Sequence, residues 1–240
     1  MDNTKQKISD NIASERLLQA GRAVADLAHL AKNIIQVMSG CGEIIDLALK
    51  TGQLDRVQKA WQLYQPSFWR LKKLQLDLIK YTKEYPLNLQ TCVVNEVANS
   101  AVQQIEGFFG KRNIMLVRQY DDRLPSVNAD GEKLREAVVN LLIAAADNLQ
   151  DQGGTVTLET AYDETTGHIR IAVSDSGPRL DAAAYNALLY PFERCRNMLG
   201  TGFEIPLANQ TAHDHGGRLN WAGESAGINR IELLFPVNRV

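Results

Sequence analysis

The chain has 240 residues and a formal net charge of −2, with 26 lysines and arginines against 28 aspartates and glutamates; hydrophobic residues make up 45% of it and charged residues 22%. This content provides for one large packed domain or two ordinary ones, and the balanced charge argues against a protein that coats nucleic acid and against a disordered acidic tail. The three cysteines (Cys41, Cys92 and Cys195) are far apart, which excludes a disulfide scaffold and indicates a reducing, cytoplasmic compartment. The N-terminus is polar, which excludes a signal peptide. No run of 18 apolar residues occurs, which excludes a membrane span.

Residues 6–50 predict one long helix with a heptad seam. Apolar or small residues recur every seven positions in two series offset by three, as at the a and d positions of a coiled coil. The series are Leu17, Val24, Ala31, Met38 and Ile45, and Ala20, Leu27, Ile34, Cys41 and Ala48. Such a helix, about 65 Å long at about 1.5 Å per residue, needs a returning helix or a second chain to cover this stripe.

A second helix is predicted after a turn at Gly52, with one apolar face from Val57 to Leu78. Pro66 lies inside this helix and should bend or split it. The two helices form a hairpin, and two arrangements are open for it. Either two chains pair into a four-helix bundle, which the heptad stripe favours, or the hairpin is an ordinary antiparallel pair packed on the second domain. We place the domain boundary at residue 86, giving domains 1–86 and 87–240.

Helices and strands mix after residue 86 without a regular βαβ rhythm. Helical spacing is found in 92–109, 132–150 and 205–217, and strand patterns in 113–121, 153–163, 168–177, 218–225 and 228–237. This order predicts an α+β sandwich in which helices cover one face of a mixed sheet.

His29 is the first candidate for chemistry. It falls at the outward heptad position f, with Asp26, Lys32 and Asn33 on the same helical surface. An exposed imidazole with open approach is what phosphoryl transfer to nitrogen requires, whereas a surface histidine with no role is the plain alternative.

Two glycine-containing turns are further candidates. Asp175 stands at the end of a predicted strand, where its carboxylate can accept a hydrogen bond from an exocyclic amine, and Gly177 would let a flat ligand approach the backbone. Gly200 and Gly202 precede a helix, whose N–H groups could meet phosphate. Each motif by itself is also an ordinary turn.

Taken in order, residues 14–237 resemble the sensor histidine kinases of two-component signalling. The matching segments are AHLAKN (28–33) for the histidine box, REAVVNLLIAAADN (135–148) for the N box, DSGPR (175–179) and GTGFEIPLA (200–208) for the glycine boxes, and YPFERCR (190–196) for the F box, with Phe192 in its key place. The resemblance implies a dimerisation and phosphotransfer hairpin followed by a gyrase-type ATP-binding domain. It assigns His29 and Asn33 to phosphoryl chemistry and Asn140, Asp175, Gly177, Gly200 and Gly202 to ATP, with Mg²⁺ as the accompanying ion.

Four departures from the family pattern stand beside these matches. Ala144 replaces the asparagine that holds Mg²⁺, with Asp147 or Asn148 as the nearest substitutes. Leu30 replaces the acidic residue that follows the phospho-acceptor. Arg179 replaces a glycine and should crowd the nucleotide. Glu204 brings a carboxylate to the place where phosphates would lie.

Three functions follow from this pattern. The first is a divergent histidine kinase that autophosphorylates on His29 from ATP and passes the phosphate to the receiver domain of a response regulator. The second is an ATP-independent phosphotransferase, phosphatase or regulatory pseudokinase dimer. The third is a binding module in which His29 is silent. Whether the protein is an enzyme is open, with a kinase-like activity favoured.

The remaining residues give no competing site. His213 and His215 have a spacing that separates them on a helix, so we expect no metal site, and His168 is expected in a solvated hairpin turn. Trp61, Trp69 and Trp221 are expected in the core or seam, and residues 70–73 lack the aromatic array of a nucleic-acid site. Two origins are open for residues 1–13: a linker from a longer sensor, or the start of a complete chain.

Overall fold

The computed structural model describes residues 2–83, 85–192, 200–223 and 228–237, and it describes side chains from residue 21 onward, Arg22 excepted. The chain divides into two compact units, Met1–Gln75 and Leu76–Val240, which are described separately. The predicted order, a helical hairpin followed by an α+β domain, is confirmed. The boundary between the two compact units falls inside the second helix. The division into functional domains at residue 86 remains a prediction.

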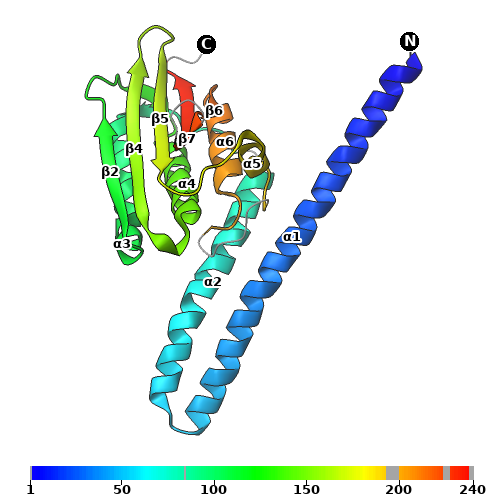
Figure 1. Cartoon of the computed structure of the whole chain (residues 1–240), viewed down its shortest axis with the longest axis vertical. Coiled ribbons are helices and arrows are strands. Elements are labelled where there is room, and N and C mark those ends of the chain that lie inside the picture. Colours follow the sequence, from blue (N-terminus) through cyan, green and yellow to red (C-terminus); the bar gives the residue numbers. More distant parts are fainter. Residues whose placement is uncertain (1, 84, 193–199, 224–227, 238–240) are drawn as a thin grey trace. The chain divides into compact units, whose positions relative to one another are not determined.

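The first unit contains α1 (Asp2–Lys50) and most of α2 (Leu54–Thr82). The turn between the two helices depends on Gly52, whose φ of 70° is accessible to glycine at little cost, and the N–H of Gln53 closes the turn by donating to the carbonyl of Ala48 at 2.8 Å. Figure 1 shows the two helices returning antiparallel from this turn. The split expected at Pro66 does not occur, because α2 runs through it without a break.

The predicted heptad seam is the inward face of α1. Ile34, Cys41 and Ala48 at position d are buried, and Ala31, Met38 and Ile45 at position a are half-buried. Val24 is 64% exposed, so the seam is covered only further along the helix. The side chains of Leu17 and Ala20 lie outside the described residues.

Large apolar side chains also remain exposed beside this seam. On α1 and α2 they include Ile35, Val37, Ile44, Leu49, Trp61, Leu63, Phe68 and Trp69. Trp61 and Trp69, which the sequence analysis placed in the core or seam, are therefore exposed in the single chain. Heptad positions e and g of a two-stranded coil are usually charged, whereas here Ile35 and Leu49 occupy e, and Val37 and Ile44 occupy g.

The second unit is built on a five-stranded mixed sheet in the order β2-β4-β5-β7-β6. Its strands are β2 (Ile114–Tyr120), β4 (Gly154–Asp163), β5 (His168–Asp175), β6 (Arg218–Trp221) and β7 (Asn229–Pro236). The β2–β4 pair is parallel, and the other pairs are antiparallel. A separate antiparallel ribbon of β1 (Gln90–Cys92) and β3 (Val127–Ala129) was not predicted.

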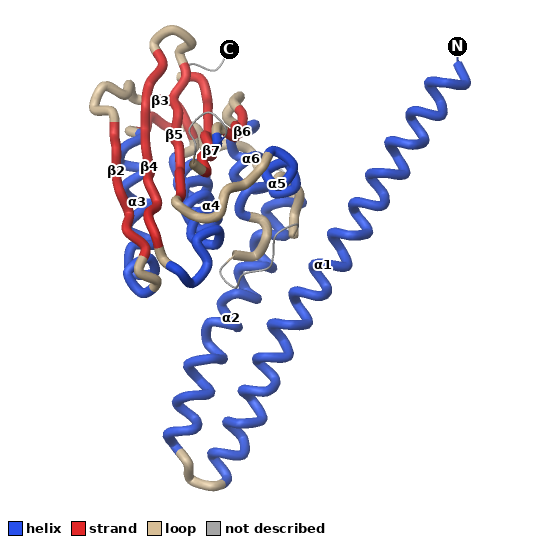
Figure 2. Tube along the Cα trace, in the orientation of Figure 1, coloured by secondary structure: helices blue, strands red, loops and turns tan. Residues whose placement is uncertain are grey.

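Helices α3 (Val94–Lys111), α4 (Gly131–Leu149) and α6 (Glu204–Asp214) cover one face of the sheet, as Figure 2 shows. The buried core lies between these helices and the inward side chains of the strands, with Leu142, Leu158, Ile171 and Phe235 among its fully buried members. Asp130 caps α4 by accepting a hydrogen bond from the N–H of Lys133 at 3.0 Å.

Two short helices complete the second unit. Helix α5 (Ala182–Leu188), which the sequence analysis missed, begins at Asp181, whose carboxylate accepts a hydrogen bond from the N–H of Ala184 at 2.7 Å. A single 3-10 turn, η1 (Gln150–Gln152), follows α4. Within the described ranges, no helix is long and apolar enough to cross a bilayer. Cys41 and Cys92 are unpaired thiols, and Cys195 lies outside the described residues.

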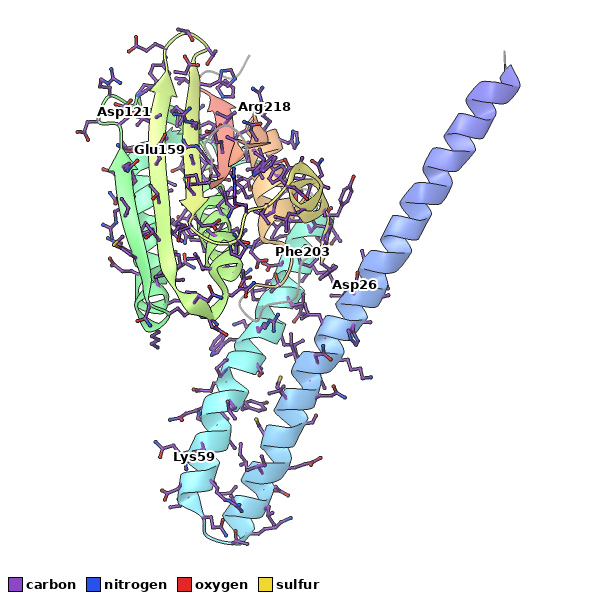
Figure 3. The ribbon with its side chains drawn as sticks, viewed as in Figure 1. Asp26, Lys59, Asp121, Glu159, Phe203 and Arg218 are labelled. Atoms are coloured by element: carbon purple, nitrogen blue, oxygen red, sulfur yellow. The ribbon has the colours of Figure 1, made fainter. Side chains whose placement is uncertain are left out.

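Because successive strand residues face opposite sides of a sheet, the face away from the helices carries a charged cluster. There Arg230 donates to Glu159 at 2.8 Å and to Glu232 at 2.8 Å, and Arg170 donates to Glu159 at 3.1 Å. The hydrogen bond from Arg230 is the main reason why the pKa of Glu159 is lowered. Figure 3 labels Glu159 on β4.

Replacement of Glu159 by Gln should lower the free energy of unfolding by about 1–2 kcal/mol at pH 7, because it removes charge-assisted bonds between three strands. The pKa of Glu159 is lower in the folded chain, so its stabilisation exists above the unfolded carboxyl pKa of about 4.3 and disappears as the pH falls through the folded value. Urea unfolding at pH 7 and pH 3 should therefore show a smaller pH dependence in E159Q. The control E106Q removes an exposed pair with Arg118 and should change stability by under about 0.5 kcal/mol; equal losses in both variants would contradict the prediction.

Candidate functional site

A cavity of about 460 Å³ opens within the second unit, between α4, α5 and α6 and the ends of β5, β6 and β7. Its walls are mostly apolar, and its polar end is formed by acidic and amide side chains. The residues that line it include Leu141, Ala144, Asp147, Asn148, Val173, Asp175, Leu180, Tyr190, Gly200, Gly202, Glu204, Trp221, Asn229 and Ile231. The cavity brings together three residues predicted from the sequence: Asp175, Gly200 and Gly202.

Asp175 lies at the end of β5, as predicted, and its carboxylate is held in a fixed orientation. Its Oδ1 accepts hydrogen bonds from Asn148 Nδ2 at 2.7 Å, from the N–H of Gly177 at 2.8 Å and from Asn229 Nδ2 at 3.0 Å. Charge-assisted bonds of this kind stabilise an ionised carboxylate inside a protein. Asp175 is therefore a pre-oriented acceptor at the cavity wall.

Asn229 lines the cavity and was not predicted from the sequence. It begins β7 directly opposite Asp175 in the β5–β7 register, and its amide is buried. Besides the bond to Asp175, Nδ2 donates to the carbonyls of Gly177 and Pro178, and Oδ1 accepts from the N–H of Leu180 at 2.9 Å. Asn229 thus ties the whole turn after β5 to β7. No local signal marks it, because the two strands are distant in sequence.

The glycine loop, defined here as residues 200–202, is bound by carboxylates of this same chain. The N–H of Gly200 donates to Asp147 Oδ2 at 3.0 Å, the N–H of Thr201 donates to Glu204 Oε1 at 2.9 Å, and the N–H of Gly202 donates to Glu204 Oε2 at 2.9 Å. A Cβ at Gly200 would lie 2.6 Å from Glu204 Oε2 and 2.9 Å from Asp147 Oδ2, so glycine is required for this close approach.

The centre of the loop is also fixed by the last turns of α2, which belong to the second unit. Thr201 Oγ1 donates to Asp77 Oδ2 at 2.6 Å, and both residues are buried. Next to it, the ring of Phe203 lies 5.4 Å from the ring of Tyr81 and 4.8 Å from the ring of Phe192; Figure 3 labels Phe203. Burial raises the pKa of Tyr81.

Phe192, the key residue of the expected F box, has a φ of 70°, which is an outlier for a bulky residue. Its N–H donates to the carbonyl of Gly202 at 3.2 Å, and its ring is buried against Phe203. Residues 193–196 of the same box lie outside the described residues. Phe192 therefore joins the start of that segment to the glycine loop.

Trp221 forms part of the cavity wall, whereas the sequence analysis had placed it in the core or seam. It stacks on Tyr185 of α5, with ring centroids 5.7 Å apart and an interplanar angle of 17°. Burial of Tyr185 raises the pKa of its hydroxyl to about 12. Trp221 thus lines the cavity while its ring is supported by the stacked ring of Tyr185.

The other predicted residues are not among those that line the cavity. Asn140 is buried in α4 and does not line it, although Ala144, one turn later, does. Arg179 is exposed and is not a lining residue, so the crowding expected from its bulk is not observed. His29 and Asn33 lie in the first unit, both exposed on α1, and Leu30 between them is buried.

The remaining histidines have structural positions. His213 is exposed in the last turn of α6, while His215 is buried, with Nε2 accepting from the N–H of Asp130 at 3.1 Å. His168 is the first residue of β5 and is half-buried, rather than a solvated turn residue. In the part of the chain that the structure describes, no group of three or more histidine, cysteine or acidic residues could hold a metal ion.

Comparison with known proteins agrees with this geometry. Residues 129–239 match the family described as histidine kinase-, DNA gyrase B- and HSP90-like ATPase. Sensor histidine kinase ZraS of Escherichia coli strain K12 is 23% identical over 98% of this chain and 50% of its own length. Sensory histidine kinase/phosphatase NtrB of Klebsiella oxytoca is 26% identical over 100% of this chain and 68% of its own length. The chain thus spans about half the length of the first relative.

Two solved structures share the fold. Full-length ShkA in complex with AMPPNP has a TM-score of 0.64 and 17% identity, over 89% of this chain and 46% of that one. Histidine kinase ThkA in complex with response regulator protein TrrA has a TM-score of 0.66 and 19% identity, over 94% of this chain and 64% of that one. The second unit therefore contains a domain of the histidine kinase type of ATPase fold. Over its whole length, the chain is similar to sensor histidine kinases.

The family implies ATP with Mg²⁺, and the residues present do not fit a triphosphate. The backbone N–H groups of the glycine loop, which would meet phosphate oxygens, already donate to Asp147 and Glu204. Ala144 lines the cavity where an oxygen ligand for the cation is expected, and a methyl group cannot coordinate Mg²⁺. Asp147 and Asn148 line it too, and both hydrogen-bond to this chain's own groups.

Replacement of Asn229 by Ala should lower the free energy of unfolding by about 2–3 kcal/mol, because it leaves buried acceptors and the N–H of Leu180 unpaired. Urea unfolding measures this loss. The control N186A removes an exposed amide on α5 and should change stability by under about 0.5 kcal/mol. A loss of that small size in N229A would show that the Asp175–Asn229 pair does not hold the turn.

Proposed function

We propose that this protein is a dimeric phosphotransfer protein of two-component signalling, in which His29 carries the phosphoryl group exchanged with the receiver domain of a response regulator. The observation that carries the proposal is the position of His29 on an exposed face of α1, outside the buried positions of the heptad seam. The family supports it, since the relatives are sensor histidine kinases. We place the protein in the cytoplasm, where receiver domains are found.

The surroundings of His29 suit exchange with a second protein. Asp26, Lys32 and Asn33 lie on the same exposed helical surface, as expected for positions three and four residues away; Figure 3 labels Asp26. In the transfer, an imidazole nitrogen attacks the phosphorus of an aspartyl phosphate, the N–P bond forms, the P–O bond breaks, and the aspartate leaves as carboxylate. The fold shared with ThkA, solved with a response regulator protein, supports a receiver as the partner.

Asn33, one turn after His29, gives the same surface a second reaction. Its amide can accept a hydrogen bond from a water molecule and orient that water toward an aspartyl phosphate, so that hydrolysis returns the receiver to its resting state. The relative NtrB is named as a kinase/phosphatase. We therefore assign Asn33 to phosphatase activity and His29 to phosphoryl exchange.

A homodimer is proposed from the apolar residues beside the seam. Ile35, Val37, Ile44 and Leu49 are about half exposed on the single hairpin, and exposed large apolar side chains that flank a helix seam are typical of a surface that binds another protein. A second hairpin would cover it in a four-helix bundle.

A kinase that autophosphorylates from ATP is the second candidate, and the match to an ATPase family favours it. Against it stand Ala144 at the expected cation position and Leu30, which is buried and supplies no base beside His29. The third candidate is a binding module with a silent histidine. The labelling experiment described next distinguishes it from the phosphotransfer protein and from the kinase.

Receiver domains from the source organism, labelled with ³²P-acetyl phosphate, should transfer acid-labile label to the wild-type protein and none to His29→Gln. The variant keeps the shape of an exposed side chain but lacks the nucleophilic nitrogen. Asn33→Ala should still accept label, while its stimulation of receiver dephosphorylation should fall about tenfold or more.

A parallel incubation with labelled ATP and Mg²⁺ distinguishes the donors. Label from receivers alone supports the proposal, and label from ATP that disappears in H29Q supports the kinase. Neither labelling nor faster receiver dephosphorylation would leave only the binding module. His213→Gln, an exposed histidine in the other unit, is the matched control and should behave as wild type.

Replacement of Ile44 by Glu should convert the dimer to monomer at micromolar concentration, because a charge would be buried against an apolar partner surface. Analytical ultracentrifugation gives the mass. Glu43→Gln, at an adjacent exposed outward position, should leave the dimer intact. A monomeric wild-type protein, or a dimeric I44E, would contradict the four-helix bundle.

A further inference from the structure

We propose that Glu204 determines the ligand specificity of the cavity: its carboxylate takes the place of a ligand phosphate on the glycine loop, so that the cavity accepts an amine-bearing, flat heterocycle and rejects polyphosphates. This proposal concerns ligand binding and goes beyond the proposed phosphotransfer function. It shares with that function one assumption, that the second unit is the ligand-binding domain of a histidine-kinase-like protein.

The first step of the argument is the geometry of the loop. Both oxygens of the Glu204 carboxylate accept hydrogen bonds at 2.9 Å from two successive N–H groups, those of Thr201 and Gly202. Successive backbone N–H groups ahead of a helix are a general binding site for phosphate and carboxylate. Here the anion is supplied by the first residue of α6, and Asp147 occupies the neighbouring N–H of Gly200.

The second step is burial. Glu204 is 5% exposed and Thr201 is 0% exposed, so the carboxylate is held inside the protein rather than at its surface. Its ionised form needs these N–H donors, because an unpaired charge at such a position would be costly. A ligand phosphate would have to displace a carboxylate that has little access to water, and the displaced charge would stay close to the phosphate.

The third step is the charge and shape of the cavity. The described residues that line it include three carboxylates, on Asp147, Asp175 and Glu204. A carboxylate accepts hydrogen bonds from N–H donors, which an amine-bearing ligand offers and an ionised polyphosphate does not. The apolar walls, which include Trp221, suit a heterocycle, and the oriented carboxylate of Asp175 suits an exocyclic amine.

A purely structural role makes a different prediction. If Glu204 only stabilises the start of α6, its removal should weaken the fold and affect all ligands alike. If it stands in for a phosphate, its removal should uncover two backbone N–H donors and change the relative affinity for ligands with and without phosphates. Adenosine and ATP are a matched pair for this purpose, since they share the amine-bearing heterocycle and differ only in the triphosphate.

Isothermal titration calorimetry without divalent cations should show that the wild-type protein binds adenosine at least tenfold more tightly than ATP. In Glu204→Ala, the affinity for ATP should rise at least tenfold, the affinity for adenosine should change less than threefold, and inorganic tripolyphosphate should bind measurably. The proposal is overturned if the wild type fails to bind adenosine, if it prefers ATP, or if the ratio of the two affinities is the same in E204A.

Two further variants keep this test decisive. Glu204→Gln retains the shape and one acceptor oxygen, so it serves if E204A does not fold, and it should shift the ratio in the same direction. Glu164→Ala removes the same charge from an exposed turn far along the sheet and should leave the ratio unchanged. His29 takes no part in these titrations, so H29Q should bind adenosine like wild type, and the failure of either proposal leaves the other standing.

Discussion

A carboxylate inside a protein must find hydrogen-bond donors, and this requirement organises the second unit around the buried Asp175 and Glu204 and the half-buried Asp147. Asp175 draws together α4, the turn after β5 and the start of β7 through amide groups and one backbone N–H. Asp147 and Glu204 fix the glycine loop from two sides. The walls of the cavity are therefore positioned by charges that the surrounding strands and helices must satisfy, and the apolar core supports them from behind.

This arrangement gives the two glycine-containing turns different roles. At Gly177 the carboxylate of Asp175 is oriented toward a cavity with apolar walls, which suits recognition of a ligand. At the glycine loop the carboxylates turn inward to the backbone, which removes the anion-binding capacity that such a loop otherwise has. The same type of interaction, an N–H donating to a carboxylate, has two different effects. It orients Asp175 toward a ligand at one end of the cavity, and it occupies the N–H donors of the glycine loop at the other end.

In the first unit, the groups that phosphoryl exchange requires are all present. Its seam is apolar, its turn is closed by a glycine, and its histidine is exposed at a regular helical position. Phosphoryl exchange through His29 requires only an accessible imidazole and a partner surface, whereas ATP chemistry requires an anion site and a cation site in the second unit. Because these demands are separate, a histidine-kinase-like chain can keep the first set of groups while the second set is put to another use.

The sequence by itself determined the helical hairpin, the heptad seam, the strands of the main sheet and the exposure of His29, because each depends on periodicity or on neighbours a few residues apart. It also placed Asp175 and the glycine loop at the ends of their elements. Only the tertiary structure decided that Asn229 completes the Asp175 cluster, that Trp221 forms a cavity wall, and that Asn140 and Arg179 lie outside the cavity. These outcomes depend on strand pairing and helix packing between residues distant in sequence. The glycine loop shows the difference: Glu204 bonds N–H groups only two and three residues before it, whereas the bonds from Asp147 and Asp77 reach the loop from distant helices.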